Sequence, residues 1–556
     1  MEWKKRDSFN TVREVFLRNV GAKSYEEVKG WFTKDYHIKG LEEAAKLILT
    51  FKDKRVTIVG DYDCDGQAST SILYMLLKSL SFNGLHIRIP HRFSEGYGIS
   101  EKIVEEIPEG LVITVDNGIA QLAPITKAKE KGLTVIVLDH HLPVEADGRK
   151  ILPKTDVCVD PKAKEESADF SGYCAAGIAY KLAELMTDDK VLLDKFLSLA
   201  AIATIADVME LREENFVFVR KYISFLGNDK KSGFMTAGLE ALVSKLGLRR
   251  QRVTAHDIAF AIAPCLNAAS RMSDTGAENG IRLLTYEGDP VKARQLADSL
   301  IETNKARKEA KNSAVAIAEE IIENENLQTT VPIVIYSGDI AQGIVGIVAG
   351  HLAEKYHVPS IVLTDSPDGL LTGSARSVEG YNVKEQLDHL AEFLEAYGGH
   401  TGAAGLSLKK ENLKPFTDKI HEISKGFKFS NPTELYYDIE ATAEEIPGLL
   451  DAVSGYKPYG EGNAEIVFMI KGFPIARNAY GKAAQFMGAD ERSLKIFSDM
   501  SEAVMFGIDD EKKELVRDKI INAQRLPRLD IVGKLTVNCF KDRVTRQVDM
   551  LDFKIA

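Results

Sequence analysis

Cysteine is scarce and scattered in this sequence. Five cysteines occur among 556 residues, and no two of them form a CxxC pair. Neither a zinc ribbon nor a disulfide framework is indicated, so we expect a reducing, cytoplasmic setting. The cysteines are Cys64, Cys158, Cys174, Cys265 and Cys539.

Long apolar runs are missing as well. The longest lies near Phe196–Ala206 and is too short to span a bilayer. The first ten residues, MEWKKRDSFN, contain no apolar core and no signal-peptide pattern. We therefore expect a cytoplasmic protein with no membrane partner.

The sequence has no excess of positive charge. Its net charge is −11, which argues against a general basic coat for nucleic acid. The net charge is an average, however, so an acidic metal site and a basic groove can coexist. A chain of 556 residues is expected to form two to four domains, at about 100–200 residues each.

The first half alternates between strand-like and helix-like segments. Val56–Val59, Leu111–Val115 and Leu133–Leu138 are short apolar runs rich in β-branched residues, and Ala68–Leu80 and Val191–Ala206 have helical patterns. This alternation is typical of a mostly parallel sheet with helices on both faces.

A long helix and a second α/β pattern follow. The segment Pro290–Glu325 is rich in Ala, Glu and Lys and predicts one long connecting helix. Beyond it we expect two strands, two helices and a glycine-rich turn: Val331–Tyr336, Ser360–Thr364, Ile344–Tyr356, Val383–Ala396 and Gly398–Gly405.

The region after about Asn431 is richer in short strands. The expected strands are Ile466–Ile470, Glu502–Phe506, Arg528–Val537 and Val544–Ile555. This pattern favours a small β-barrel, and a five-stranded OB-fold is the first candidate for a nucleic-acid module.

Acidic residues follow three of the expected strands directly. Asp61-Tyr62-Asp63-Cys64-Asp65-Gly66 comes after the first, Asp116-Asn117-Gly118 after the second and Asp139-His140-His141 after the third. The carboxyl ends of parallel strands line one crevice, so these side chains should meet there. Their mutual repulsion calls for divalent cations, and mixed Asp and His ligands suit Mn²⁺ or Mg²⁺.

Simpler interpretations exist for each motif alone. DYDCDG could be a turn with helix-capping aspartates, and Asp-His-His could be a capped loop. A calcium loop of the DxDxDG type would require Glu six residues after the glycine, where this chain has Ile72. Three such coincidences at three strand ends are much harder to accept than one.

The motifs together resemble those of a known family. DYDCDG, TVDNGI, VLDHH and IATIADVMEL, in this order, are similar to successive motifs of the DHH phosphoesterase superfamily. Further segments resemble RecJ exonucleases in particular: IPHRFSEGYG at Ile89–Gly98, APCLNAASRM at Ala263–Met272, GSARS at Gly373–Ser377, GGHTGAAG at Gly398–Gly405 and KPYGEGNAEIVF at Lys457–Phe468.

The resemblance implies two metal sites. Asp63 and Asp65 would bind one cation each, Asp116 would bridge both, and His140 and Asp207 would complete the second site. Asp61 would lie among the ligands of the first cation or just behind them. Some relatives have His where this chain has Val59, so the ligand set of the first site differs. His141 would face the scissile phosphate.

The resemblance also implies substrate contacts. Candidates are Arg92, Arg271, Ser374, Arg376 and His400. An arginine is well suited to a phosphate because its planar guanidinium can donate two parallel hydrogen bonds. Gly398, Gly399, Gly402 and Gly405 would let backbone amides approach an anion. For Asn267, the sequence does not separate loop packing from substrate contact.

The implied architecture has five parts. They are an N-terminal helical extension (1–50), a DHH catalytic domain (51–285), a connecting helix (286–327), a DHH-associated α/β domain (328–430) and an OB-fold-like domain (431–556). The candidate basic contacts of the last domain with nucleic acid are Lys534, Lys541, Arg543 and Arg546. The implied activity is metal-dependent 5′-to-3′ hydrolysis of single-stranded DNA in repair and recombination. We expect a monomer, with a helicase and a single-strand-binding protein as candidate partners.

Two other functions stay open. A DHH phosphodiesterase could act on short oligonucleotides, pyrophosphate or cyclic dinucleotides, although such substrates need no strand-tracking β domain. A non-catalytic scaffold could share the fold, although every expected acidic position is filled here. Comparing the turnover of short and long strands distinguishes the small-substrate phosphodiesterase from the exonuclease. A metal-binding titration distinguishes the non-catalytic scaffold from an enzyme.

Overall fold

The computed structural model describes every residue except 428–433, 489–490 and 541–542, and omits the side chains of 539, 540 and 543. The chain divides into two compact units. The larger unit contains Tyr36–Asp207 and Tyr222–Asn431. The smaller unit contains Met1–Asp35, Val208–Lys221 and Pro432–Ala556.

A five-stranded parallel sheet forms the first half of the larger unit. The order is β3 (Gly84–Arg88), β2 (Arg55–Val59), β4 (Leu111–Val115), β5 (Thr134–Leu138) and β8 (Val157–Val159). The three strands predicted before the acidic motifs are confirmed. β4 is buried along its whole length, as expected for a parallel strand covered on both faces.

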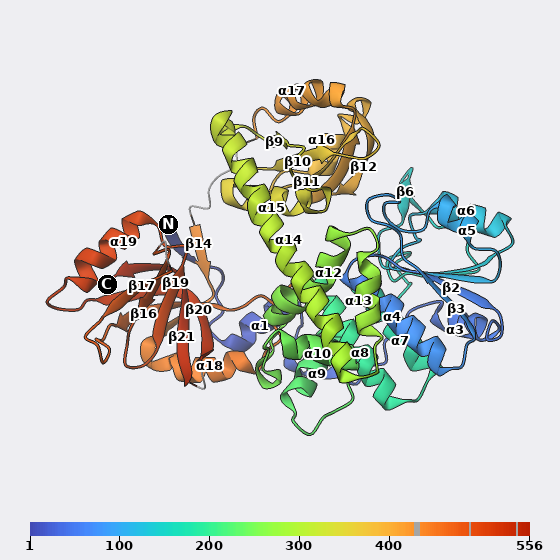
Figure 1. The fold of residues 1–556 in the computed structure, drawn as a ribbon. Helices are drawn as coiled ribbons and strands as arrows, with labels where there is room; N and C mark the ends of the chain where they lie inside the picture. Colours follow the sequence, from blue (N-terminus) through green and yellow to red (C-terminus); the bar gives the residue numbers. More distant parts are fainter. Residues whose placement is uncertain (428–433, 489–490, 541–542) are drawn as a thin grey trace. The chain divides into compact units, whose positions relative to one another are not determined.

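Helices cover both faces of this sheet (Figure 1). On one face, α5 (Glu101–Glu106) and α6 (Leu122–Glu130) pack on the apolar side chains of β2, β4 and β5. On the other face, α4 (Cys64–Ser79) contacts β2, β3 and β4, and α7 (Ala175–Met186) packs against α4. Helix α4 begins at Cys64 rather than at the predicted Ala68, so the acidic motif runs directly into its first turn.

The predicted long helix is confirmed as α14 (Pro290–Asn324), the yellow-green helix of Figure 1. A mixed sheet follows, in the order β12 (Leu394–His400), β13 (Ala403–Leu408), β11 (Leu371–Arg376), β10 (Ser360–Asp365) and β9 (Ile333–Tyr336). Only the β9–β10 pair is parallel. The expected helix near Ile344–Tyr356 is α15 (Val345–Tyr356).

Two predicted elements in this region are shorter than expected. The helix expected over Val383–Ala396 ends at Asp388 as α16 (Val383–Asp388), and the chain becomes strand β12 at Leu394. The expected glycine-rich turn is a hairpin, in which Gly398 pairs with Gly405 and Gly399 with Ala404. Leu394 and Tyr397 pack on the core of this sheet, and that packing outweighs the helical pattern of the preceding residues.

The smaller unit contains a seven-stranded sheet rather than the five strands expected. All four expected strands are present, as β16 (Val467–Pro474), β19 (Glu502–Phe506), β20 (Arg528–Phe540) and β21 (Arg543–Ile555). The other members are β15 (Ile439–Thr442), β17 (Ala484–Met487) and β18 (Ser493–Ile496). Among the described residues, none of the helices has the length and apolarity that crossing a bilayer requires.

The N-terminal segment belongs to the smaller unit. Strand β1 (Glu2–Lys5) pairs in parallel with β14 (Glu434–Tyr437). Helix α1 (Val12–Val20) carries Phe16, and α2 (Tyr25–Gly30) precedes Trp31. Both aromatic rings pack against Phe216, with centroids 5.9 Å away in each case. These contacts explain why Met1–Asp35 and Val208–Lys221 cluster with the C-terminal residues.

Gly66 is a position where the acidic loop cannot accept a side chain. A Cβ atom there would lie 2.5 Å from the carbonyl carbon and oxygen of Asp61. We predict that Gly66→Ala lowers the free energy of unfolding by about 1–3 kcal/mol, because the clash is with backbone. Urea titration measures this loss. Gly227→Ala is the matched control, since nothing lies within 4 Å of its Cβ position. Equal stability of the two variants would contradict the packing argument.

Candidate metal centre

The loop after β2 is held by its own aspartates. Asp63 is the N-cap of α4, and its carboxylate accepts the N–H groups of Asp65 and Gly66, both at 3.0 Å. The side-chain oxygen of Asn267 accepts the N–H of Cys64 at 2.8 Å. Asn267 therefore positions the start of the helix, a role that the sequence left open.

Asp65 points into the interior from the first turn of α4. Only 1% of it is exposed, and its two carboxylate oxygens accept the N–H groups of Ala175 and Ala176 at 2.7 and 2.8 Å. These amides are the free donors at the N-terminus of α7, where a negative charge is favoured. Burial and the neighbouring Asp63 nevertheless raise the pKa of Asp65 to about 6.

Asp116 adopts a left-handed backbone conformation directly after β4. Its φ is 63°, which is costly for a residue with a side chain and is typical of functional sites. Its N–H donates to the carbonyl of Leu138 at 3.0 Å. The side chain of the next residue, Asn117, donates to the carbonyls of Val59 and Gly60 at 3.1 Å each. Asn117 thus ties the ends of β2 and β4 together.

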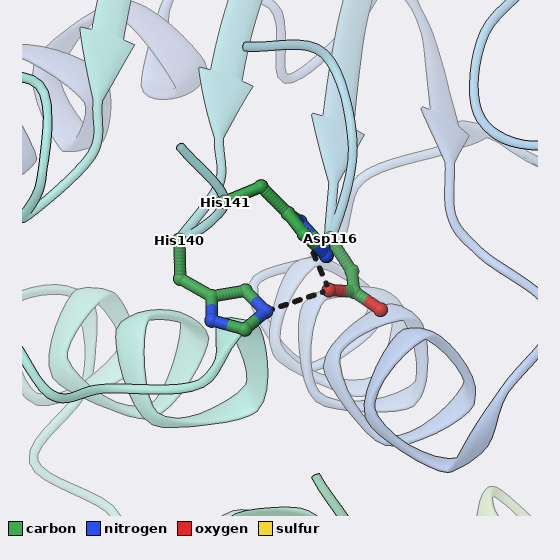
Figure 2. A group of neighbouring side chains, drawn as sticks. All are labelled: Asp116, His140 and His141. Carbon is green, nitrogen blue, oxygen red and sulfur yellow. Dashed lines mark ion pairs between the residues drawn. The ribbon is translucent and has the colours of Figure 1, made fainter. Parts of the chain in front are cut away.

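The two histidines after β5 are directed at Asp116 (Figure 2). His140 is 4% exposed, and its Nε2 lies 3.2 Å from the Asp116 Oδ1. Asp139 holds the other ring, because its Oδ1 lies 2.8 Å from the Nδ1 of His141. Its second oxygen accepts the N–H of Ile119 at 2.9 Å. In the predicted Asp-His-His motif, the aspartate therefore fixes the loop by hydrogen bonds, and the two histidines direct their imidazole rings at Asp116.

The acidic residues form two clusters that Asp116 connects. Asp61, Asp63 and Asp116 make one cluster, and Asp65, His140 and Asp207 make the other, each with ligand atoms within 4.8 Å of one another. Asp116 also lies within this distance of His140 and His141. Asp207 reaches the second cluster from the C-terminal end of α8 (Lys190–Ala206).

The electrostatics of these clusters are unfavourable without cations. Burial, followed by repulsion from Asp65, raises the pKa of Asp116 well above its usual range. The same two causes raise the pKa of Asp207 to about 8. Burial also lowers the pKa of His140 to about 3, so its ring is neutral at pH 7, as a metal ligand must be.

The donor set fits divalent cations. Asp61 Oδ1, Asp116 Oδ1 and both ring nitrogens of His140 are buried and have no hydrogen-bond partner among the described residues. Such groups are costly unless something compensates them. Carboxylate oxygens with an imidazole suit Mn²⁺, and the oxygen-rich first cluster also suits Mg²⁺.

His141 differs from its neighbour in charge. Burial lowers its pKa, but the Asp139 hydrogen bond and nearby carboxylates more than offset this and raise it to about 9. The Tyr97 hydroxyl lies 3.1 Å from His141 Nδ1 and donates to the Asp116 carbonyl at 2.7 Å. Sequence reasoning missed Tyr97, although it lies within the quoted segment IPHRFSEGYG; only the fold shows where its hydroxyl points.

Three of the predicted substrate-binding residues are arginines of the larger unit whose positive charges repel one another. Arg92 stacks on the ring of Tyr62, with its guanidinium carbon 4.6 Å from the centroid. Burial, followed by repulsion from Arg92, lowers the pKa of Arg271 to about 10. The same causes lower the pKa of Arg376. The structure therefore places Arg92, Arg271 and Arg376 near one another, as an anion site requires.

Ser374 and α15 complete the surroundings of Arg376. Its Nη1 donates to the Ser374 hydroxyl at 2.6 Å and to the Ala375 carbonyl at 2.8 Å. A Cβ on Gly346, in the first turn of α15, would lie 2.9 Å from Nη2 of Arg376. His400 is not brought into this group by any hydrogen bond or ion pair of the described residues. It is exposed at the end of β12, and its Nδ1 accepts the Gly402 N–H at 3.2 Å.

The predicted basic contacts of the smaller unit are only partly described. Lys534 forms an ion pair with Glu465 at 2.8 Å, and Arg546 is exposed. Lys541 and the side chain of Arg543 lie outside the described residues.

Three family models match successive parts of the chain. The DHH family N-terminal domain matches residues 55–204, the DHHA1 domain residues 328–426 and the RecJ OB domain residues 437–552.

Curated relatives match over most of the chain. The single-stranded-DNA-specific exonuclease RecJ of Escherichia coli is 31% identical, with 69% of each chain covered. The chain belongs to the RecJ family. The RecJ of Bacillus subtilis is also 31% identical over 94% of this chain, and the chain spans 64% of that relative's length.

A solved RecJ structure has the same fold. The crystal structure of Thermus thermophilus RecJ in complex with Mn²⁺ matches with a TM-score of 0.76 and 25% identity. The match covers 98% of this chain and 75% of the Thermus chain. The RecJ fold assigned from the sequence is confirmed.

The stability of the metal-free protein should fall between about pH 6.5 and pH 8.5. Asp207 and His141 have folded pKa values of about 8 and about 9, above their ordinary values of 3.8 and 6.5. The stability that each of these two groups contributes is fully present below its pKa in the unfolded chain. It is lost as the pH rises through the pKa of the group in the folded protein. Because Mn²⁺ binds deprotonated ligands, it should raise the melting temperature more at pH 8.5 than at pH 6.5.

Thermal unfolding with and without Mn²⁺ at the two pH values measures this difference. Asp207→Asn is the control, because it removes one of the two titrating groups and should reduce the pH dependence. A stabilisation by Mn²⁺ that is the same at both pH values would show that these groups do not titrate as described.

Proposed function

We propose that this chain is a metal-dependent exonuclease that removes nucleotides from the 5′ end of single-stranded DNA. The observation that carries the proposal is the pair of acidic clusters joined at Asp116, with Arg92 and Arg271 beside the first cluster and Arg376 close to these arginines. Membership of the RecJ family supports it, because the named relatives are single-stranded-DNA-specific exonucleases.

The proposed ligands follow the two clusters. Asp61, Asp63 and Asp116 would hold one cation, and Asp65, Asp116, His140 and Asp207 the other. Two Mn²⁺ or Mg²⁺ ions there would activate the attacking water and neutralise charge on the phosphate. Asp116 is the natural shared ligand, since its carboxylate lies in groups with Asp61 and Asp63 and with His140.

His141 has a different proposed role. Asp139 fixes its ring, and its raised pKa keeps it protonated at neutral pH. It can therefore donate a proton or a hydrogen bond to an oxygen of the scissile phosphate, where negative charge develops. Tyr97, which contacts the same ring, restrains its orientation.

The arginines provide a reason for end recognition. Arg92 and Arg271 act electrostatically on Asp61 and Asp63, so a phosphate at the arginines lies beside the first cluster. Only one end of a strand can place its terminal phosphate at the arginines while its first internucleotide linkage lies at the cations. Arg92, Arg271, Arg376 and Ser374 would bind this phosphate, and His400 is a further candidate.

We propose domain boundaries at 50, 285, 327 and 430, with the DNA-binding role of 431–556 extended by the N-terminal residues that share its unit. A helicase and a single-strand-binding protein are proposed partners, and the cytoplasm is the proposed location. The OB domain match favours long strands over small phosphoesters.

Digestion of single strands labelled at one end tests the function. With Mn²⁺ or Mg²⁺, a 5′-labelled strand should release labelled mononucleotide at once, whereas a 3′-labelled strand should shorten progressively. Long strands should be turned over more efficiently than dinucleotides. Asp116→Ala is the control and should keep the fold while losing all but a few per cent of activity. Labelled mononucleotide released first from the 3′ end would refute the assigned polarity.

Arg376→Ala should weaken recognition of the 5′ phosphate. A charge-assisted contact to phosphate contributes about 1.5–3 kcal/mol, so catalytic efficiency should fall about ten- to hundredfold. The loss should be larger for 5′-phosphorylated strands than for 5′-hydroxyl strands, which lack that group. Steady-state kinetics of both enzymes on both substrates give the comparison. An equal loss on the two would instead assign Arg376 to the internal backbone of the strand.

A further inference from the structure

Strand β8 brings a fourth loop to the edge where the metal ligands lie. It pairs in parallel with β5, and the register places Val159 opposite Leu138. The N–H of Asp139 continues this pairing by donating to the Val159 carbonyl at 3.0 Å. The segments Asp139-His140-His141 and Asp160-Pro161-Lys162 therefore leave the sheet side by side.

The loop after β8 is firmly held. Asp160 is 2% exposed, and its Oδ1 accepts the N–H of Lys162 at 2.6 Å. The carbonyl of Lys162 accepts the Nζ of Lys150 at 2.6 Å. The backbone of Lys162 is thus fixed from two directions, and its side chain starts from a defined point beside the Asp-His-His loop.

The Lys162 ammonium lies near the second metal cluster. Its charge acts on His140, Asp160 and Asp207, in each case lowering the pKa. Among the described residues, no hydrogen bond or ion pair engages its Nζ. A cation placed near these groups without a partner is available to an anionic ligand.

The cations around the metal centre divide between two sides. Arg92 and Arg271 act on Asp61 and Asp63, the ligands of the first cluster. Lys162 acts on His140 and Asp207, the ligands of the second. Asp116 lies between the two clusters. A strand whose 5′ phosphate sits at the arginines and whose first linkage sits at the cations therefore continues toward Lys162.

We propose that Lys162 binds the second internucleotide phosphate of the strand, one linkage to the 3′ side of the scissile bond. This inference rests on the proposed exonuclease function. An ammonium there fixes the strand beyond the cleaved linkage, so that three successive phosphates have three separate sites. Lys162 is then a substrate-binding residue rather than a ligand or a stabiliser of the metals.

The test combines Lys162→Ala with a neutral methylphosphonate at the second linkage. We expect Lys162→Ala to lower kcat/KM about tenfold on an ordinary strand, as loss of one charge-assisted phosphate contact does. The methylphosphonate should lower the wild-type value to a similar degree but cause no further loss in the variant. Lys162→Arg, which keeps the charge, should recover part of the activity.

The affinity for Mn²⁺ is the second readout. If Lys162 only offsets the repulsion among the carboxylates, its removal should strengthen Mn²⁺ binding and leave kcat/KM at saturating Mn²⁺ unchanged. The proposal requires the loss of kcat/KM to persist at saturating Mn²⁺, with Mn²⁺ affinity equal to or greater than that of the wild type. Weaker Mn²⁺ binding would make Lys162 a support of the metal site and overturn the proposal.

Lys164→Ala is the matched control, because it removes the same charge from an exposed position two residues away. It should leave kcat/KM on both substrates unchanged. Wild-type activity in Lys162→Ala, or equal sensitivity of variant and wild type to the methylphosphonate, would overturn the inference and leave the exonuclease function intact. Failure of the wild-type protein to degrade any strand would instead refute the proposed function.

Discussion

Repulsion among buried carboxylates is the constraint on which the rest of the site depends. Asp61, Asp65 and Asp116 are each at most 2% exposed, and each is close to another carboxylate. Like charges so close in a low-dielectric interior cannot all stay ionised unless cations join them. The fold therefore favours the binding of divalent cations at this edge of the sheet before any substrate is considered.

Neutral groups hold these charges in place. The N-terminal amides of α7 bind Asp65, the amide of Asn117 joins β2 to β4, and Asn267 fixes the start of α4. The strained backbone of Asp116 is maintained by this framework rather than by its own preference. Metal affinity is therefore built from backbone and amide contacts that come from several separate parts of the sequence.

Local patterns predicted the parallel sheet and the meeting of acidic side chains at one edge of it, because each acidic motif directly follows a buried apolar strand. They failed at Val383–Ala396, where packing of Leu394 and Tyr397 on the core of their own sheet overrides a helical pattern. Tyr97 and Lys162 could not be assigned, since their positions depend on strand register and loop bracing rather than on spacing. His400 was expected in the phosphate site from its motif, but in the hairpin it is exposed.

The proposed metal centre has one carboxylate, that of Asp116, shared between two cation sites. Crystals of the protein soaked in Mn²⁺ and measured near the manganese absorption edge test it most directly. We expect two anomalous peaks about 3.5–4 Å apart, both coordinated by Asp116. A single peak, or two peaks that do not share Asp116, would contradict it.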